Sequence, residues 1–290
     1  MVKNNNPLVS VIMPVFNGEK TILLALESLK LQSYKNWKCY IINDGSTDST
    51  KDILDNLDDS RFIIIHLEMN QGRSKARQIA LDLVEGEYLT FLDADDFYHV
   101  EKLKKQLQIF NDYPQVDLVS CGMGCYDDNF DLITVKGNKK IGPEMYKISM
   151  HFYPARAPSM IRLPKAKTIK YNSKLKYAED TDYFTRYINN NKYYVTNEIL
   201  YYYSEFTSVN SKKILDGYLS EALRGMYILY DYPFSGFKIF ILSIMKWFYI
   251  NIKIFFVNHR ELIKSRGLEA EIYEKEKFST NLKTLKKDYE

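Results

Sequence analysis

The sequence predicts an α/β protein with a mostly parallel sheet that helices cover on both faces. Short, continuously apolar segments alternate with longer amphipathic segments from Val9 onward, a pattern typical of strands buried on both faces. The chain has 290 residues, of which 46% are hydrophobic, which suffices for one large domain with an appendage. A polar loop follows each apolar segment, where parallel sheets bind ligands.

The first 115 residues contain four consecutive pairs of strand and helix. The apolar segments VSVIMPV, WKCYIIN, RFIIIHL and EYLTFLD are expected to be the strands. Helices are expected near 21–32, 49–57, 74–85 and 101–111, where apolar residues recur at helical spacing. The loops 14–19, 43–48, 70–77 and 93–96 therefore meet at one edge of the sheet and predict a single site.

The rest of the chain divides into two parts. Residues 116–215 favour mixed strands and loops, with VDLVSCGM, DLITV, PSMIRL and YYVTNEILYYY as strands around a helix near 180–190. Residues 216–290 favour helices. We therefore expect a main domain over 1–215, with halves at 1–115 and 116–215, followed by a helical C-terminal region.

Composition excludes some classes of protein. A net charge of +3 is too small for a nucleic-acid-binding protein unless the excess is concentrated on one face. The three cysteines form an odd set and no signal sequence begins the chain, so we expect a reducing, cytoplasmic environment. Cys121 and Cys125 have no second cysteine pair or nearby histidine to complete a zinc site.

The segment YLTFLDADD is the most informative stretch of the chain. Asp93, Asp95 and Asp96 leave the fourth strand together, and carboxylates this close repel one another unless a divalent cation neutralises them. The alternative interpretation is a solvated acidic turn that caps the next helix. The neighbouring loops favour the metal site.

The loop NDGSTDST offers a second carboxylate at the same edge. Asp44 ends a strand and could accept the imide N–H of a uracil ring, whereas Asp48 is placed to cap the following helix. Arg77 could complement the neighbouring oxygens, or it is simply an exposed helical residue.

Phosphate binding and proton transfer need further groups. Neither a GxGxxG fingerprint nor a GxxxxGK[ST] loop occurs, so a metal ion at Asp95 is expected to hold a diphosphate and stabilise it as a leaving group. Glu179 and Asp180 open a helix, where a carboxylate stays ionised as a general base requires. The alternative is an ordinary acidic helix N-terminus.

Together these motifs resemble the glycosyltransferases of family 2, which have the nucleotide-diphospho-sugar transferase fold called GT-A. The resemblance covers roughly residues 9–210, and a helical extension follows. The matching segments are SVIMPVFNGE, INDGSTDST, NQGRSKARQIAL, GEYLTFLDADD with its DxD motif, and YAEDTDYFTRY.

The resemblance implies roles for individual residues. Residues 1–115 would bind the nucleotide sugar and residues 116–215 the acceptor. The nucleoside pocket would be lined by Pro14, Val15, Phe16 and Asn17. Asp44 would contact uracil, Asn70 and Arg77 would hold the nucleotide, Asp93 would contact the ribose, Asp95 would bind Mn²⁺ or Mg²⁺, and Asp180 would deprotonate the acceptor hydroxyl.

The implied reaction is an inverting, in-line transfer of a hexose or N-acetylhexosamine from a UDP-sugar. The acceptor would be a lipid-linked glycan of a bacterial O-antigen, capsule or lipooligosaccharide. One sugar per visit is expected, because the QxxRW motif and membrane spans of processive relatives are missing from the sequence. An inactive nucleotide-sugar-binding protein and a nucleotidyltransferase are the alternatives. The intact Asp95 and Asp180 argue against the first, and PVFNGE in place of a Gly-rich basic loop argues against the second.

Two features leave alternatives open. Many relatives carry a histidine where this chain has Glu205, so either Glu205 is a metal ligand or that contact is missing. The segment 237–260 is apolar, with Lys238, Lys246, Lys253 and Arg260 on one side of a helix. It fits either an in-plane helix on the anionic inner face of the cytoplasmic membrane or a helix packed on the main domain with its lysines reaching water.

Overall fold

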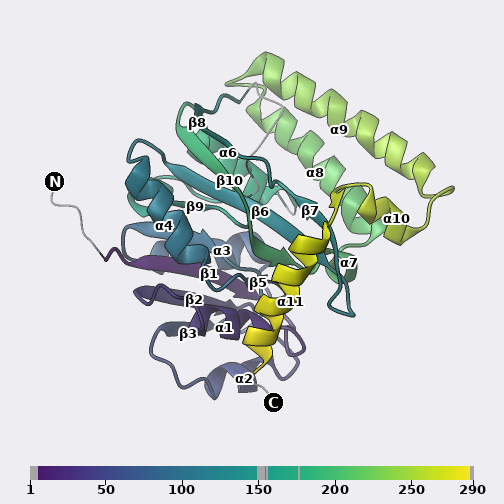
Figure 1. The fold of residues 1–290 in the computed structure, drawn as a ribbon. Helices are drawn as coiled ribbons and strands as arrows, with labels where there is room; N and C mark the ends of the chain where they lie inside the picture. Colours follow the sequence, from purple (N-terminus) through teal and green to yellow (C-terminus); the bar gives the residue numbers. More distant parts are fainter. Residues whose placement is uncertain (1–5, 149–153, 155, 176, 288–290) are drawn as a thin grey trace.

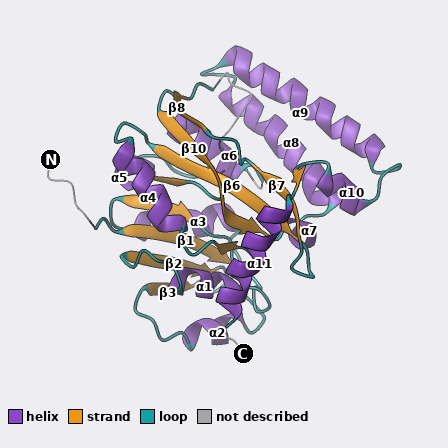
Figure 2. Cartoon of the chain, in the orientation of Figure 1, coloured by secondary structure: helices purple, strands orange, loops and turns teal. Residues whose placement is uncertain are grey.

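The computed structural model describes residues 6–148, 154, 156–175 and 177–287. Its centre is a sheet of 11 strands between layers of helices (Figures 1 and 2). The strands β1 (Val9–Val15), β2 (Trp37–Asn43), β3 (Phe62–His66) and β4 (Tyr88–Phe91) are parallel and lie in the order β4-β1-β2-β3. The predicted α/β class with parallel strands is thus confirmed.

Alternation along the strands explains why helices cover both faces. Val11 and Met13 of β1 pack with the helices α1 (Ile22–Lys30) and α4 (Lys102–Asp112), whereas Ile12 between them packs with α3 (Arg73–Leu83). Successive side chains of a strand point to opposite faces, so a continuously apolar strand must be covered twice. A shorter helix, α2 (Thr50–Asp55), adds Leu54 to the first of these two cores.

The second half of the sheet is mixed. The predicted strands appear as β6 (Leu118–Tyr126), β7 (Leu132–Lys136), β9 (Met160–Arg162) and β10 (Lys192–Tyr203), with α6 (Glu179–Ile188) on the predicted helix. β9 pairs antiparallel with both β4 and β6, and this joins the two halves into one sheet.

Several short elements were not predicted. They are β5 (Phe97–Tyr98), β8 (Ile141–Met145), α5 (Leu163–Ala166), α7 (Glu205–Ser208) and β11 (Leu268–Glu269). β5, α5, α7 and β11 have only two to four residues, and the sequence of β8, IGPEM, has neither an apolar run nor a regular alternation. Both β5 and β8 pair with β10.

The C-terminal region contains α8 (Ser211–Ile228), α9 (Pro233–Lys253), α10 (His259–Lys264) and α11 (Ile272–Lys286). The expected boundary at 215/216 falls inside α8. Phe278 and Leu285 of α11 share a core with Phe97 and Tyr202, so α11 packs on the central sheet (Figure 1). In the described ranges we find no helix that combines the length and the apolar character needed to cross a bilayer.

Candidate active site

A solvent-open cleft of about 1380 Å³ lies beyond the carboxyl ends of the parallel strands. It gathers most of the residues singled out from the sequence, although these come from segments up to 166 residues apart. They are Pro14, Val15, Phe16, Asn17, Asp44, Asn70, Asp93, Asp95 and Asp180. Arg77 and Glu205 are not among the residues that line it. Residues 149–153, 155 and 176 of the half expected to bind the acceptor, 116–215, lie outside the described residues.

The wall of the cleft after β1 is fixed by the loop after β2. The backbone amide of Thr47 donates to Asn17 Oδ1 at 2.8 Å, and the amide of Asn17 donates to Ser46 Oγ at 2.9 Å. Asn17 has a φ of 52°, a conformation that asparagine tolerates better than most residues. The predicted cap is wrong by one residue: Ser49 is the N-cap of α2, and Asp48 before it accepts the amides of Thr50 at 3.0 Å and Glu19 at 3.1 Å, which joins the loops after β2 and β1.

Asp44 holds the loop after β3 against the cleft. Its two carboxylate oxygens accept the amides of Gln71 at 2.7 Å and Gly72 at 2.9 Å. The neighbouring Gly45 has a φ of +68°, and a Cβ there would lie 2.5 Å from the backbone nitrogen of Asn70. Only glycine lets the two loops approach so closely. Each Asp44 oxygen retains a second lone-pair site for a ligand donor.

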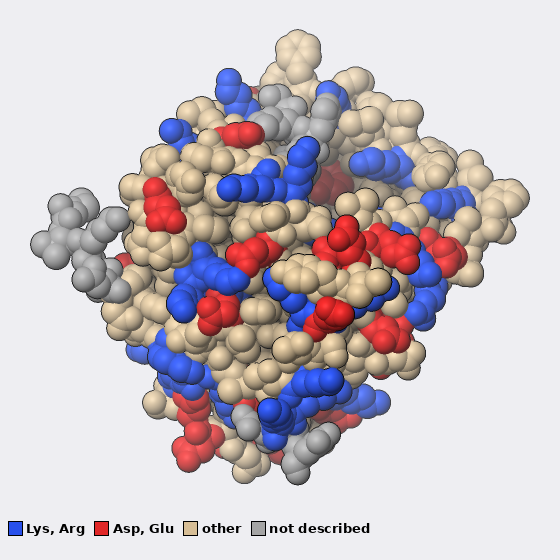
Figure 3. Space-filling view, viewed as in Figure 1, with Lys and Arg blue, Asp and Glu red and all other residues tan. Residues whose placement is uncertain are grey.

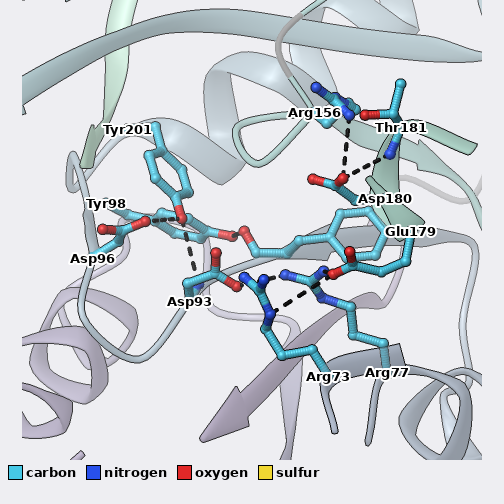
Figure 4. A network of polar contacts seen from close by, with 11 residues as sticks. Arg73, Arg77, Asp93, Asp96, Tyr98, Arg156, Glu179, Asp180, Thr181 and Tyr201 are labelled. Atoms are coloured by element: carbon cyan, nitrogen blue, oxygen red, sulfur yellow. Dashed lines mark hydrogen bonds and ion pairs between the residues drawn. The ribbon is translucent and has the colours of Figure 1, made fainter. Parts of the chain in front are cut away.

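Arg77 lies beneath the cleft and bridges two acidic segments (Figure 4). Its Nη2 is 3.0 Å from Asp93 Oδ1, and its Nη1 is 2.6 Å from Glu179 Oε1. Arg77 is only 7% exposed, so it acts on the cleft through these partners. Burial disfavours its charge, but Asp93 and Glu179 outweigh burial and raise the pKa of Arg77. Burial and, next, Asp180 raise the pKa of Glu179, and they outweigh Arg77 and Arg73, which lower it.

The three acids after β4 have separate environments. Asp96 is buried and accepts hydrogen bonds from the Tyr201 hydroxyl at 2.6 Å and the Ser204 amide at 2.9 Å, so it anchors the turn to the end of β10. Burial, then Asp95 and Asp93, raise its pKa well above the usual value. Asp95 lines the cleft, and burial and then Asp93 raise its pKa too.

The surroundings of Asp95 fit a divalent cation. No salt bridge found among the described residues neutralises this carboxylate. Within the same residues no cluster of three His, Cys, Asp or Glu side chains could hold a metal ion. One or two carboxylates suffice for Mg²⁺, which commonly completes its shell with water and substrate phosphates.

Asp180 faces the cleft from the first turn of α6 and pairs with Arg156. Asp180 Oδ1 is 3.2 Å from Arg156 Nη1, and these side chains are 38% and 29% exposed. Burial raises the pKa of Asp180, but Arg156, Arg77 and Arg73 outweigh burial and lower it to about 2. Asp180 is thus ionised at neutral pH, and its nearest cation is a partly exposed one.

Glu205 is buried and does not line the cleft. It is 1% exposed and forms ion pairs with Lys136 and, at 3.0 Å, with Arg266. Two cations already neutralise this carboxylate, so the structure gives no support for a metal-ligand role. Its position instead fixes Arg266, which lines the cleft.

The sequence reasoning missed several cleft residues. Arg73 and Tyr177 flank Asp180, and Lys213 and Tyr218 come from α8, which the sequence assigned largely to the appendage. Lys213 and Arg266 carried no recognisable signal, because their positions depend on how α8 and the segment before β11 return to the sheet. Together with Arg73 and Arg156 they give the cleft a set of cations suited to an anionic ligand.

The sheet order and the cleft beyond the strand ends agree with the GT-A fold that the sequence resemblance implies. Residues 10–163 match the family model Glycosyl transferase family 2, more than half of the chain. The chain therefore belongs to glycosyl transferase family 2.

Individual relatives agree with this assignment. The Escherichia coli enzyme WfaP, "UDP-Glc:alpha-D-GlcNAc-diphosphoundecaprenol beta-1,3-glucosyltransferase", is 40% identical over 100 residues, 34% of this chain and 40% of WfaP. Several curated relatives are matched over only 40% to 42% of their length.

Two solved structures share the fold. Residues 1–349 of Staphylococcus aureus TarS, solved in complex with UDP-GlcNAc, are 25% identical with a TM-score of 0.57, over 76% of this chain and 66% of that one. A Pyrobaculum calidifontis mannosyltransferase has a TM-score of 0.61 at 14% identity, over 84% of this chain and 70% of that one.

Proposed function

We propose that this glycosyltransferase moves one sugar from a UDP-sugar to a hydroxyl group of a lipid-linked glycan and inverts the anomeric configuration. One observation carries the proposal: Asp95, which forms no salt bridge with another described residue, and Asp180, an ionised carboxylate, face the same cleft. These are the two groups that a metal-assisted displacement with a general base requires. The donor is a hexose or N-acetylhexosamine linked to UDP.

The uridine binds between the loops after β1, β2 and β3. Asp44 accepts the imide N–H of uracil, and the segment 14–17 with Asn70 encloses the nucleoside. Asp93 is 33% exposed and directs its free oxygen to the ribose, while Arg77 keeps it in place from below. The UDP-GlcNAc complex of TarS supports this choice of nucleotide.

The diphosphate lies next to Asp95, which would hold Mn²⁺ or Mg²⁺. When bound, the ion supplies charge neutralisation for the departing diphosphate. Arg73, Lys213 and Arg266 line the same cleft and add positive potential around the phosphates. A metal requirement and the DxD role of Asp93 and Asp95 are part of this proposal.

Asp180 acts as the base that removes the proton from the acceptor hydroxyl. A carboxylate with a pKa of about 2 is ionised but weakly basic while it is paired with Arg156. The donor diphosphate offers Arg156 a competing anion, so donor binding would release Asp180 for catalysis. The attack then occurs in one step, opposite the departing UDP, without a glycosyl–enzyme intermediate.

The acceptor is a growing glycan of a bacterial O-antigen, capsule or lipooligosaccharide, carried on a lipid at the inner face of the cytoplasmic membrane. The description of WfaP, which names a diphosphoundecaprenol acceptor, supports a lipid-linked substrate. Residues 116–215 together with α8 form the acceptor side of the cleft, and residues 1–115 form the donor side.

The variant Asp180→Asn tests the assignment of the base. UDP affinity, measured by calorimetry with Mn²⁺ present, should stay within about threefold of wild type, while transfer from the preferred UDP-sugar falls by about 10²–10⁴-fold. Asp182→Asn is the control, because it removes a carboxylate from the same helix that bonds Arg186 instead of facing the cleft. Transfer by Asp180→Asn within tenfold of wild type would show that Asp180 is not the base. The anomeric configuration of the product, read by NMR, tests inversion separately.

A further inference from the structure

The helix α9 contacts the protein through two small residues and one isoleucine, and it exposes many of its large apolar residues. Its buried positions are Gly236, Ser243 and Ile250, seven residues apart. Phe237, Met245, Phe248 and Ile252 are 59% to 61% exposed, and Phe234 is 91% exposed. A surface helix in water normally does the reverse, whereas small residues at the helix contact are typical of helices whose outer face meets lipid.

Glycines set the contact between α8 and α9. A Cβ on Gly236 would lie 2.7 Å from the carbonyl oxygen of Gly225, and a Cβ on Gly225 would lie 2.8 Å from the backbone nitrogen of Phe240. The two backbones therefore touch, and no large side chain of α9 is needed between them. Leu223 and Met226 of α8 and Tyr230 in the turn after it are also exposed, so the hairpin adds apolar surface beside that of α9.

Charge is arranged beside this apolar surface. At about 100° per residue, Phe234, Phe237, Ile241, Met245, Phe248 and Ile252 span roughly 80° opposite the Gly236 side of α9. Lys238, Lys246 and Lys253 follow on one flank, and the 21 residues of α9 contain no Asp or Glu. In Figure 3 the edge of the molecule over α9 is mainly tan with blue patches.

We infer that the outer face of the α8–α9 hairpin docks on an anionic lipid bilayer. The apolar wedge enters the boundary between headgroups and acyl chains, and the flanking lysines meet lipid phosphates. A second copy of the chain fits less well, because a symmetric contact would bring three lysines of each α9 together without a carboxylate on either helix. The positive charges of α9 therefore match an anionic surface better than they match a second α9.

Docking would bring the active site close to the bilayer. Lys213, Ile214, Gly217 and Tyr218 of α8 line the cleft, while Gly225 of the same helix touches α9. Because α8 and α9 both lie between the cleft wall and the docked face, the two are about two helix diameters apart, roughly 20 Å. The turn before α9 is fixed to α6, since Asn189 Nδ2 donates to the Tyr232 hydroxyl at 2.8 Å. This inference rests on the proposed lipid-linked acceptor for its purpose, though not for its test.

Co-sedimentation of the full chain with vesicles of phosphatidylcholine and phosphatidylglycerol tests the inference. Wild type should bind these vesicles at least tenfold more tightly than vesicles of phosphatidylcholine alone. The variant Phe237→Ser/Phe248→Ser should lose at least tenfold in affinity, because both side chains are exposed on the wedge. The control Ile272→Ser/Tyr273→Ser removes two similarly exposed apolar side chains from α11 and should bind like wild type.

Two results would overturn the inference. One is equal vesicle binding by wild type and Phe237→Ser/Phe248→Ser. The other is a wild type that does not bind vesicles but forms a concentration-dependent dimer in analytical ultracentrifugation, which the variant does not form. The hairpin would then be a contact between two copies of the chain. Transfer to a water-soluble acceptor, assayed in parallel, should be unchanged in the variant. A protein that binds vesicles and transfers nothing would contradict the proposed function alone.

Discussion

Replacing Arg77 by methionine should strongly lower the free energy of unfolding, because it breaks the ion pairs under the active site. Arg77 is buried between Asp93 and Glu179, with N–O distances of 3.0 Å and 2.6 Å. Methionine keeps much of the side-chain volume but leaves the Glu179 carboxylate, 2% exposed, without its nearest cation. Breaking a buried ion pair in this way costs about 3–5 kcal/mol of unfolding free energy.

The destabilisation should depend on pH. Burial and Asp180 already raise the pKa of Glu179, and the loss of Arg77 raises it further. In the variant the folded state therefore binds a proton more tightly than the unfolded state does, so stability falls as pH rises through the folded pKa. The difference in unfolding free energy between wild type and Arg77→Met should consequently be larger at pH 8 than at pH 5.

Urea unfolding followed by circular dichroism at both pH values measures these differences. Arg77→Met/Glu179→Gln should recover about 2 kcal/mol or more at pH 8, because the unpaired charge is gone. Arg61→Met, which breaks a more exposed pair with Asp59, should cost no more than about 1 kcal/mol. A loss below about 1 kcal/mol for Arg77→Met, or no recovery in the double variant, would refute the reasoning.

Three further predictions concern the cleft and the core. Asp95→Asn should abolish the increase in UDP affinity that Mn²⁺ gives wild type, expected to be at least about tenfold and measured by calorimetry; an unchanged increase would place the ion elsewhere. Arg156→Met should raise the pKa of Asp180 above about 2, because it removes a cation that lowers it. The acidic limb of kcat/KM should then move up by at least about one pH unit; an unmoved limb would exclude Asp180 as the group that titrates. Lys102 is buried, and burial lowers its pKa to about 7. Between that pH and the ordinary value of 10.5 the unfolded state binds more protons, so wild type should gain stability with pH relative to Lys102→Met. Parallel stability curves from pH 7 to 10 would contradict this.

The sequence was sufficient for the parts of the molecule that depend on local periodicity. β1 to β4 and their helices were predicted within a few residues because buried strands and amphipathic helices leave distinct patterns. The gathering of Asp44, Asp93 and Asp95 in one cleft follows from the parallel order of the strands, since their carboxyl ends must meet at one edge.

Contacts between distant segments could not be predicted in the same way. The local sequence identifies Arg77 only as a polar residue of a helix. Its burial depends on Glu179, which lies 102 residues later in the chain and contacts it. In the sequence Glu205 likewise resembled a free carboxylate ligand for a metal. In the structure it pairs with Lys136, which precedes it in the chain, and with Arg266, which follows it. Single-sequence periodicity carries no information about such pairings.

The charges around the cleft suggest why the proposed metal ligand and the proposed base differ in behaviour. Asp180 has Arg156, Arg77 and Arg73 nearby and stays ionised, whereas the charge of Asp95 is opposed by burial and by Asp93. A cation and a diphosphate that arrive together would relieve the repulsion at Asp95 and draw Arg156 from Asp180 at the same time. On this reasoning donor binding prepares both the leaving group and the base, so acceptor deprotonation should follow donor binding and not precede it.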